Sequence, residues 1–326
     1  MLWQMQEIFV GIILPILMLA GIGVLLQRWR PMDIPTLAKL NIYLLVPAFL
    51  FVRVSESTMT WSEIGGIVAA VLIPTVLIGL TIFAVARPAR VPGPTIAAMI
   101  VGTVIYNAGN FGVPLALLLY PEGSQPPFEG MRATTDGAAV QALVLMMSNL
   151  CIWCFGFILV SVAKGHGLRR AVVNYLKLPL FYALIAALMV RELRSHDYVI
   201  PTVITFPLHQ LGLAIVPISL ITLGAQLAHR AKMPNWRRVS PIVALKLLGM
   251  PAATGVTVWL LGLWPWPGVQ IVIASSAPTA INTLLVTVEL DGDTDLTADA
   301  VFATTVVCAV TVTIVIVAMK MLAPAG

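Results

Sequence analysis

Charged residues are scarce in this chain. Only 10% of its 326 residues are Asp, Glu, Lys or Arg, whereas 59% are hydrophobic. A soluble protein carries roughly 25% charged residues, because water has to solvate its surface. This shortage excludes an ordinary soluble domain and predicts an all-α polytopic membrane protein, with lipid as the partner that covers its apolar surface.

Cysteine and histidine are also few, which removes several classes of site. The three cysteines lie in apolar runs, so we expect no disulfide framework. The four histidines show no metal-ligand spacing, and the calcium-loop-like start at Asp291 lacks the required later Gly and Glu. Motifs for phosphate loops, dinucleotide binding and activated nucleophiles are missing as well. We therefore expect no metal site, no cofactor and no enzymatic activity.

Ten segments are apolar enough and long enough to cross a bilayer, which takes about 20 residues. They are 8–27, 35–52, 64–86, 95–119, 138–162, 172–190, 201–227, 239–262, 269–290 and 298–320. The connections between them are short, and no small-residue cleavage site follows the first span. The sequence therefore predicts ten transmembrane helices with neither a soluble domain nor a cleaved signal.

Lysine and arginine are distributed unevenly between the two sets of loops. Of the 19 basic residues, 13 lie after spans 1, 3, 5 and 7, and five lie on the opposite face. Basic loops remain in the cytoplasm during insertion, so both termini are predicted to lie outside. The net charge of +5 has this membrane explanation, and we expect no nucleic-acid partner.

Two of the ten spans carry polar and helix-breaking residues at their centre. These residues are Asn107, Asn110, Gly112 and Pro114 in the fourth span, and Ser276, Pro278, Thr279 and Asn282 in the ninth. Lipid offers no partner for an unpaired peptide group, so irregular backbone at this depth must face protein or a watery cavity. Such a pair of interrupted spans predicts a carrier's substrate site, whereas the structural alternative is close packing of kinked helices.

Lys246 is the one clearly intramembrane charge in the sequence, about eight residues into the eighth span. A buried ammonium is costly unless it is paired, solvated or next to a cavity. The sequence leaves three roles open: attracting a substrate carboxylate, replacing a coupling cation, or extending back to the membrane surface.

Other polar residues inside the spans are most simply interpreted as hydrogen-bonding groups between helices. They are Asn41, Gln141, Ser148, Asn149, Thr222, Gln226, Thr304 and Thr305. Each of them could also line the cavity.

The two halves of the chain echo each other. Val46-Pro47 in the second span corresponds to Val216-Pro217 in the seventh, and the interrupted fourth span corresponds to the ninth. If each repeat holds five spans, the second must insert upside down, because five is odd. We therefore expect two inverted five-helix repeats, 1–165 and 166–326.

Several short motifs, taken in order, resemble the auxin efflux carrier family. They are Asn41-x5-Pro47, Asn107-x2-Asn110-x-Gly112-x-Pro114, Asn149-x3-Trp153, Gly224-x2-Leu227, Lys246-x4-Pro251 and Ala277-Pro278. The resemblance is to the bacterial branch, which is related to plant PIN proteins and often labelled malate or malonate permeases. It extends over nearly the whole chain, but the long cytoplasmic insert of plant members is missing.

The resemblance implies a fold similar to bile-acid symporters and sodium/proton antiporters. Spans 1, 2, 6 and 7 would form a scaffold, and spans 3–5 and 8–10 a transport domain. Spans 4 and 9 would cross at Pro114 and Pro278, beside the substrate. A homodimer, elevator-type motion and the cytoplasmic membrane of a bacterium are also implied.

The function predicted from the sequence is secondary transport of a small organic anion, a carboxylate or an auxin-like weak acid. The predicted substrate-binding residues are the eight at the two interruptions together with Lys246. The alternatives are a cation/proton antiporter or a sodium-coupled organic-anion symporter of the same fold. An antiporter would need a buried Asp or Glu, and spans 4, 5, 8 and 9 offer none at depth.

Overall fold

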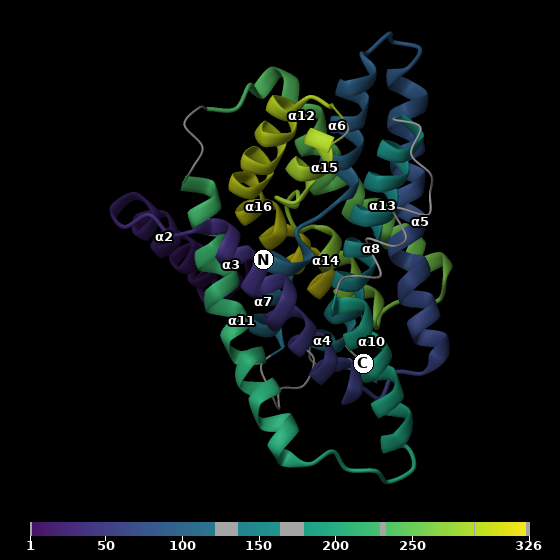
Figure 1. Ribbon diagram of the computed structural model, residues 1–326. Helices are drawn as coiled ribbons and strands as arrows, with labels where there is room; N and C mark the ends of the chain where they lie inside the picture. The colour runs from purple at the N-terminus through teal and green to yellow at the C-terminus, as the bar shows by residue number, and fades with distance from the viewer. Residues whose placement is uncertain (1, 121–135, 164–178, 229–232, 290, 324–326) are drawn as a thin grey trace.

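The computed structural model describes residues 2–120, 136–163, 179–228, 233–289 and 291–323 (Figure 1). Across these residues the chain is helical, and its one bridge between extended segments joins Tyr106 to Thr279. The first half contains α1 (Leu2–Ile8), η1 (Phe9–Ile13), α2 (Leu14–Trp29), α3 (Ile34–Leu40), η2 (Asn41–Leu45), α4 (Val46–Ser55), α5 (Trp61–Ala86), α6 (Gly93–Val104), η3 (Ala108–Gly112), α7 (Val113–Leu119) and α8 (Gly137–Ala163). The second half contains α10 (Pro179–Arg194), α11 (Thr202–Ala228), α12 (Trp236–Ala244), η4 (Leu245–Gly249), α13 (Met250–Leu260), α14 (Gly268–Ser275), α15 (Thr283–Glu289) and α16 (Thr294–Leu322).

The prediction of a multi-pass membrane protein is confirmed. Among the described residues, six helices are long and apolar enough to cross a bilayer, namely Met5–Trp29, Ile34–Ser55, Trp61–Ala86, Thr202–Ala228, Trp236–Leu260 and Thr294–Leu322. Three shorter apolar helices accompany them, Gly93–Val104, Ala108–Leu119 and Gly137–Ile152. Each of the ten predicted spans contains helix, although 172–178 lies outside the described residues. The arrangement of these helices as two inverted repeats stays a prediction.

A wide π-helical turn precedes four of the prolines, and each proline is the second residue of the helix that follows. The pairs are η1 with Pro15, η2 with Pro47, η3 with Pro114 and η4 with Pro251. A proline has no N–H for the preceding turn, and its ring collides with the carbonyl four residues back. Widening that turn to an i→i+5 pattern removes the collision and still pairs most peptide groups. The helices therefore continue past these prolines.

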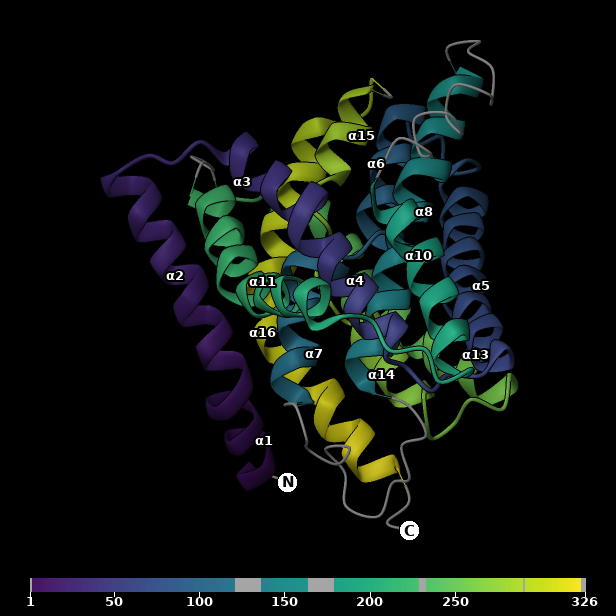
Figure 2. The ribbon, with the colours of Figure 1, turned by 60° about the horizontal axis from the view of Figure 1, so that its bottom comes forward.

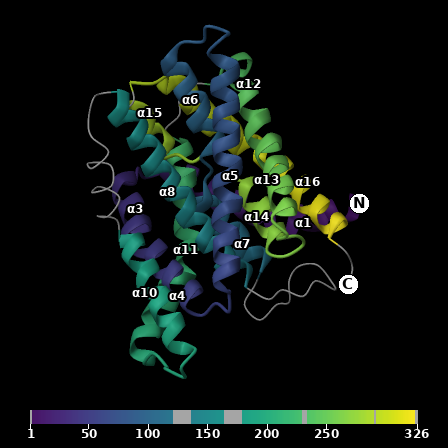
Figure 3. The ribbon, with the colours of Figure 1, turned by 90° about the vertical axis from the view of Figure 1, so that its right-hand side faces the viewer.

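The helices pack in two neighbouring groups. In the first, α2 packs on α11 and α4 on α10; in the second, α5 contacts α6, α8 and α13, and α16 contacts α6 and α12. The helices α2 and α11 lie at one edge of the molecule and α5 and α13 at the opposite edge (Figure 2). A view from the side places α4 and α10 on one side of α5, and α12, α13 and α16 on the other (Figure 3).

Two glycines allow α2 and α11 to approach backbone to backbone. A Cβ atom on Gly224 would lie 1.8 Å from the carbonyl oxygen of Ala20, and one on Gly23 would lie 2.2 Å from that of Ile221. Because lipid provides no hydrophobic drive between helices, close packing at small residues is a main source of association within a membrane.

We expect Gly224→Ala to lower the melting temperature of the purified protein, because the added methyl group must push α2 away from α11. Gly212→Ala is the matched control on the same helix, since no atom lies within 4 Å of its added Cβ. The control should melt at or slightly above the wild-type temperature, as alanine favours helix over glycine. Equal melting of the two variants would contradict the close contact.

Polar contacts join helix ends on one face of the molecule. Asp293 caps α16 by accepting the Leu296 N–H at 3.0 Å, pairs with Arg238 of α12 and accepts the Thr95 hydroxyl of α6 at 3.3 Å. Partial burial alone would raise the pKa of the Asp293 carboxyl. The bonds from Leu296, Arg238 and Thr95 outweigh that effect and hold its pKa below the usual value.

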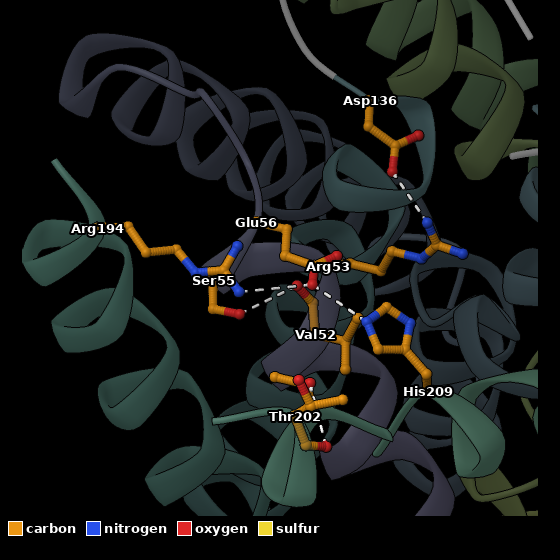
Figure 4. A network of polar contacts seen from close by, with 9 residues as sticks. Val52, Arg53, Ser55, Glu56, Asp136, Arg194, Thr202 and His209 are labelled. Carbon is orange, nitrogen blue, oxygen red and sulfur yellow. Dashed lines mark hydrogen bonds and ion pairs between the residues drawn. The ribbon is translucent and has the colours of Figure 1, made fainter. Parts of the chain in front are cut away.

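The opposite face carries a second set of polar contacts, shown in Figure 4. Glu56, just after α4, lies 3.6 Å from Arg194 of α10 and 3.1 Å from His209 of α11. Arg53 of α4 lies 3.5 Å from Asp136, which precedes α8. Partly exposed ion pairs of this kind add little stability. They do establish that the ends of α4, α10 and α11 are neighbours, as are α4 and the start of α8.

Asp293→Asn should destabilise the protein at neutral pH and have progressively less effect in acid. A carboxyl whose pKa is depressed by folding contributes stability above its unfolded pKa, and that contribution is lost as the pH falls through the folded pKa. The measurement is the melting temperature of both proteins as a function of pH. Asp295→Asn is the control, because Asp295 lies in the same first turn of α16 without these contacts.

Candidate functional site

Two helices are interrupted near the centre of the molecule. The first, α6, ends at Val104, and helical structure resumes at Ala108. The second, α14, ends at Ser275, and α15 begins at Thr283. The predicted interruption of both spans is therefore confirmed.

The two non-helical segments cross and pair with each other. The Asn107 N–H donates to the Pro278 carbonyl at 2.7 Å, and the Ala280 N–H donates to the Ile105 carbonyl at 3.2 Å. These bonds form a short antiparallel bridge at the crossing. The expectation that Pro114 marks the crossing point is wrong, because Pro114 lies in α7. The wide turn η3 lets the helix Ala108–Leu119 continue past Pro114, and the crossing lies before that helix begins.

Hydroxyl groups on neighbouring helices satisfy further peptide groups at the crossing. Ser148 of α8 donates to the Tyr106 carbonyl at 3.1 Å. Thr304 of α16 accepts the Thr279 N–H at 3.0 Å, and the Thr279 hydroxyl donates to the Gly102 carbonyl at 2.6 Å. Unpaired peptide groups are costly away from water, so these contacts hold the irregular backbone in place. For Ser148 and Thr304, the interpretation as hydrogen-bonding groups between helices is confirmed.

Gln141 of α8 connects the two interrupted helices. Its Nε2 donates to the Ala108 carbonyl at 2.9 Å, and its Oε1 accepts Nε2 of Gln270, in α14, at the same distance. Both side chains are buried. A Cβ on Gly112 would lie 2.5 Å from the Gln141 amide nitrogen, so the predicted site residue Gly112 makes room for this contact.

Gln141→Leu should destabilise the protein by about 1–3 kcal/mol for each buried polar group left unpaired. The double variant Gln141→Leu/Gln270→Leu should lose less than the sum of the two single variants, because it removes both members of one pair. The measurement is reversible unfolding of the four proteins in detergent. Additive losses would contradict the coupling.

A polar pocket lies beside the crossing. Its lining includes five asparagines from different parts of the chain, namely Asn41, Asn107, Asn110, Asn149 and Asn282. Tyr106, Ser148 and several apolar residues complete it, and none of the described lining residues is charged. Three of the predicted substrate-binding residues, Asn107, Asn110 and Asn282, are thus brought together in one cavity.

Asn107 lines this pocket and carries a buried, unpaired donor. Its Oδ1 accepts the Asn110 N–H at 3.0 Å and so caps the helix that begins at Ala108. Its Nδ2 is buried and has no hydrogen-bond partner among the described residues. A buried amide donor without a partner is costly, and a ligand with an acceptor atom would satisfy it.

The first turn of the helix Ala108–Leu119 contributes Ala108, Gly109 and Asn110 to the pocket wall. A helix N-terminus carries partial positive charge and unpaired N–H groups, which favour an anion. The pocket can therefore stabilise negative charge without a basic residue in its lining.

The other predicted site residues lie around the pocket and not in its lining. Gly112 and Pro114 support η3 and α7, while Ser276, Pro278 and Thr279 form the crossing segment of the second broken helix. All five residues are buried, and for Ser276 and Thr279 the exposed fraction is zero.

Lys246 also lies outside the lining, with its side chain fully buried. Its Nζ donates to the Ser275 carbonyl at 2.8 Å and sits 4.8 Å from the centroid of the Tyr106 ring. The amino group is therefore directed toward the crossing segments, which excludes the alternative that it extends to the membrane surface.

For Asn41 and Asn149 the sequence predicts hydrogen bonds between helices and does not single them out as site residues. Asn41 meets that expectation, because it accepts the Ser219 hydroxyl at 3.2 Å and donates to Thr222 at 3.4 Å, both in α11. Asn149 bonds instead to the Leu145 carbonyl of its own helix. Both also line the pocket. Their asparagine side chains inside apolar spans were the available signal.

A polar, uncharged cavity beside two crossing half-helices in a multi-pass helical protein defines a membrane transporter. A family model described as "Membrane transport protein", that of the auxin efflux carrier family, matches residues 8–316. The chain therefore belongs to the auxin efflux carrier family, as the sequence motifs predict. A search of curated proteins finds no match to it.

Proposed function

We propose that this transporter is a secondary carrier for a small organic anion, a mono- or dicarboxylate or an auxin-like weak acid. The observation that carries the proposal is the free Nδ2 of Asn107, a buried donor in a pocket lined by five asparagines. A carboxylate is rich in acceptors and would pair with this donor and with the amides of Asn110 and Asn282. The helix N-terminus at Ala108 adds favourable electrostatics.

The charge of the lining supports an anion over a cation. Proton antiport requires a carboxylate that loses and regains a proton, and the described lining contains neither Asp nor Glu. A pocket of amides and hydroxyls would hold an anion through hydrogen bonds and then release it, because no fixed basic residue binds it too tightly.

The packing supports a scaffold that carries a moving transport domain. The pairs α2 with α11 and α4 with α10 would form the scaffold, and α5, α6, α8 and α12–α16 the transport domain. Asn41 contributes to the pocket from η2 at the scaffold, and Asn107 contributes from the transport side. Sliding of one group past the other would carry the site across the membrane. Homodimers, the bacterial inner membrane and termini on the outside belong to this proposal.

The pocket lies in the half of the molecule where α3 begins, which the distribution of basic residues places toward the cytoplasm. The Arg53–Asp136 ion pair links the two groups of helices on the opposite face (Figure 4).

Purified protein in liposomes should take up labelled malate or malonate, and Asn110→Ala should abolish uptake. Asn107→Asp is the sharper variant: its carboxylate can still cap the helix, but it lacks the free donor and repels an anion. We expect at least about a tenfold loss of affinity for Asn107→Asp, from one lost hydrogen bond to a charged group.

Asn235→Ala is the control, because Asn235 is an exposed asparagine just before α12 and does not line the pocket. It should transport at the wild-type rate. Normal uptake by Asn110→Ala and Asn107→Asp would show that the pocket is not the substrate site. Failure of wild-type liposomes to accumulate any organic acid tested would refute the proposed function.

A further inference from the structure

A second cavity lies at the other end of the helices that line the central pocket. Its volume is about 310 Å³, and its walls come from the ends of α4 and α7 and the first half of α11. On α4, Val46 lines the central pocket and Arg53 lines this cavity, with roughly 10 Å of helix between them. Leu50 of α4 and Leu115 of α7, which lie between the two levels, are buried in the apolar core. The second space, here called the Arg53 cavity, is therefore separate from the central pocket.

The lining of the Arg53 cavity has the composition of a small-molecule site. Arg53, Tyr120 and His209 are its polar members, and the rest of the described lining is apolar side chains and Gly212. Cavities that bind organic ligands begin at about 300 Å³ and are mostly apolar, with a few polar groups that fix orientation. The central pocket differs, because five asparagines line it. The two cavities therefore suit different ligands.

Tyr120 brings an unsatisfied donor to this cavity. Its exposed fraction is only 6%, and its hydroxyl has no hydrogen-bond partner among the described residues. Its ring is fixed in place, because it packs edge-on against Trp266 at 5.6 Å between centroids and a Cβ on Gly137 would lie 2.5 Å from it. A buried tyrosine hydroxyl usually finds a partner. An acceptor atom of a ligand in the cavity would supply one.

Arg53 gives the cavity a positive charge. Its guanidinium lies 3.5 Å from Asp136, and its side chain is 18% exposed. A guanidinium has five N–H donors in a fork that matches a carboxylate, so it can contact a ligand without leaving Asp136. His209 is held by Glu56 at 3.1 Å (Figure 4). Neither carboxylate belongs to the described lining, so the charge presented to the cavity is basic.

We propose that the Arg53 cavity binds a small amphipathic carboxylate, such as an aromatic acid. The apolar body would fill the space between α4, α7 and α11, and the carboxylate would accept hydrogen bonds from Arg53 and from the Tyr120 hydroxyl. This binding site does not depend on the proposed substrate site. Its consequence for transport does rest on the proposed function: a ligand held by α4 and by Tyr120 contacts both groups of helices, and it would restrain their sliding and inhibit uptake.

The test uses benzoate as the probe and the melting temperature of the purified full chain as the readout, since a bound ligand raises it by mass action. All proteins carry Asn107→Asp, which disables the central pocket. Benzoate should stabilise this parent protein, and adding Tyr120→Phe should weaken its apparent affinity at least about tenfold, because a hydrogen bond to a charged group is lost. Tyr182→Phe is the matched control and should change nothing, since Tyr182 is an exposed tyrosine of α10 that lines neither cavity.

Without ligand, Tyr120→Phe should melt no lower than its parent, because the hydroxyl that it removes has no partner. A lower melting temperature, equal benzoate affinity of the Tyr120→Phe and Tyr182→Phe proteins, or no response of the parent to benzoate would each overturn the site. Arg53→Gln is a second variant and should also weaken benzoate at least about tenfold. If Asn107→Asp does not fold, Asn110→Ala takes its place as the parent.

Transport gives a separate readout. In liposomes, benzoate should lower the maximal rate of malate uptake by the wild type, and uptake by Tyr120→Phe should be less sensitive to it. Equal sensitivity of the two proteins would overturn the inhibitory role. Absence of malate uptake in every protein would count against the proposed function, and the melting measurements would still decide whether the Arg53 cavity binds the carboxylate.

Discussion

Every peptide group exposed by a broken helix in a membrane has to find a partner inside the protein. Here the two breaks satisfy each other through the bonds from Asn107 to Pro278 and from Ala280 to Ile105. Ser148, Thr304 and Lys246 pair with groups that the bridge leaves over. The polar residues at the centre of this apolar protein therefore satisfy one requirement, and the polar pocket is the space beside the backbone that they support.

The distribution of charge around the crossing separates two tasks. The pocket lining holds amides and hydroxyls, which can pair with acceptor atoms, while the buried amino group of Lys246 lies behind Tyr106. A buried ammonium in direct contact with a carboxylate would form a strong pair inside a low dielectric and would slow release. The amino group of Lys246 is instead held by the Ser275 carbonyl and does not line the pocket.

Much of this arrangement could be predicted from the sequence, because its strongest signals are local. Asparagine, glycine and proline inside otherwise apolar spans located both interruptions, and the scarcity of other charges singled out Lys246. The crossing point could not be predicted, since it depends on which segments pair in space and not on where the prolines lie. Proline is also an incomplete signal for the local helix type: Pro74 lies inside α5 without a wide turn, whereas Pro114 follows one. The hydrogen bond between Gln141 and Gln270 joins residues 129 positions apart, so no local sequence pattern predicts it.

The wide turns before Pro47 and Pro251 have a consequence for how these helices tolerate a change in length. A π turn is equivalent to an α turn with one residue inserted, and one residue rotates a helix by roughly 100°. Upstream and downstream side chains are thus out of phase across η2 and η4, which contain Asn41 and Lys246. The wide turn absorbs that extra residue, so deleting a single residue there would restore a regular α turn and leave both halves of the span facing the same neighbours. Deleting a residue elsewhere in the same span would rotate one half against the other by roughly 100°.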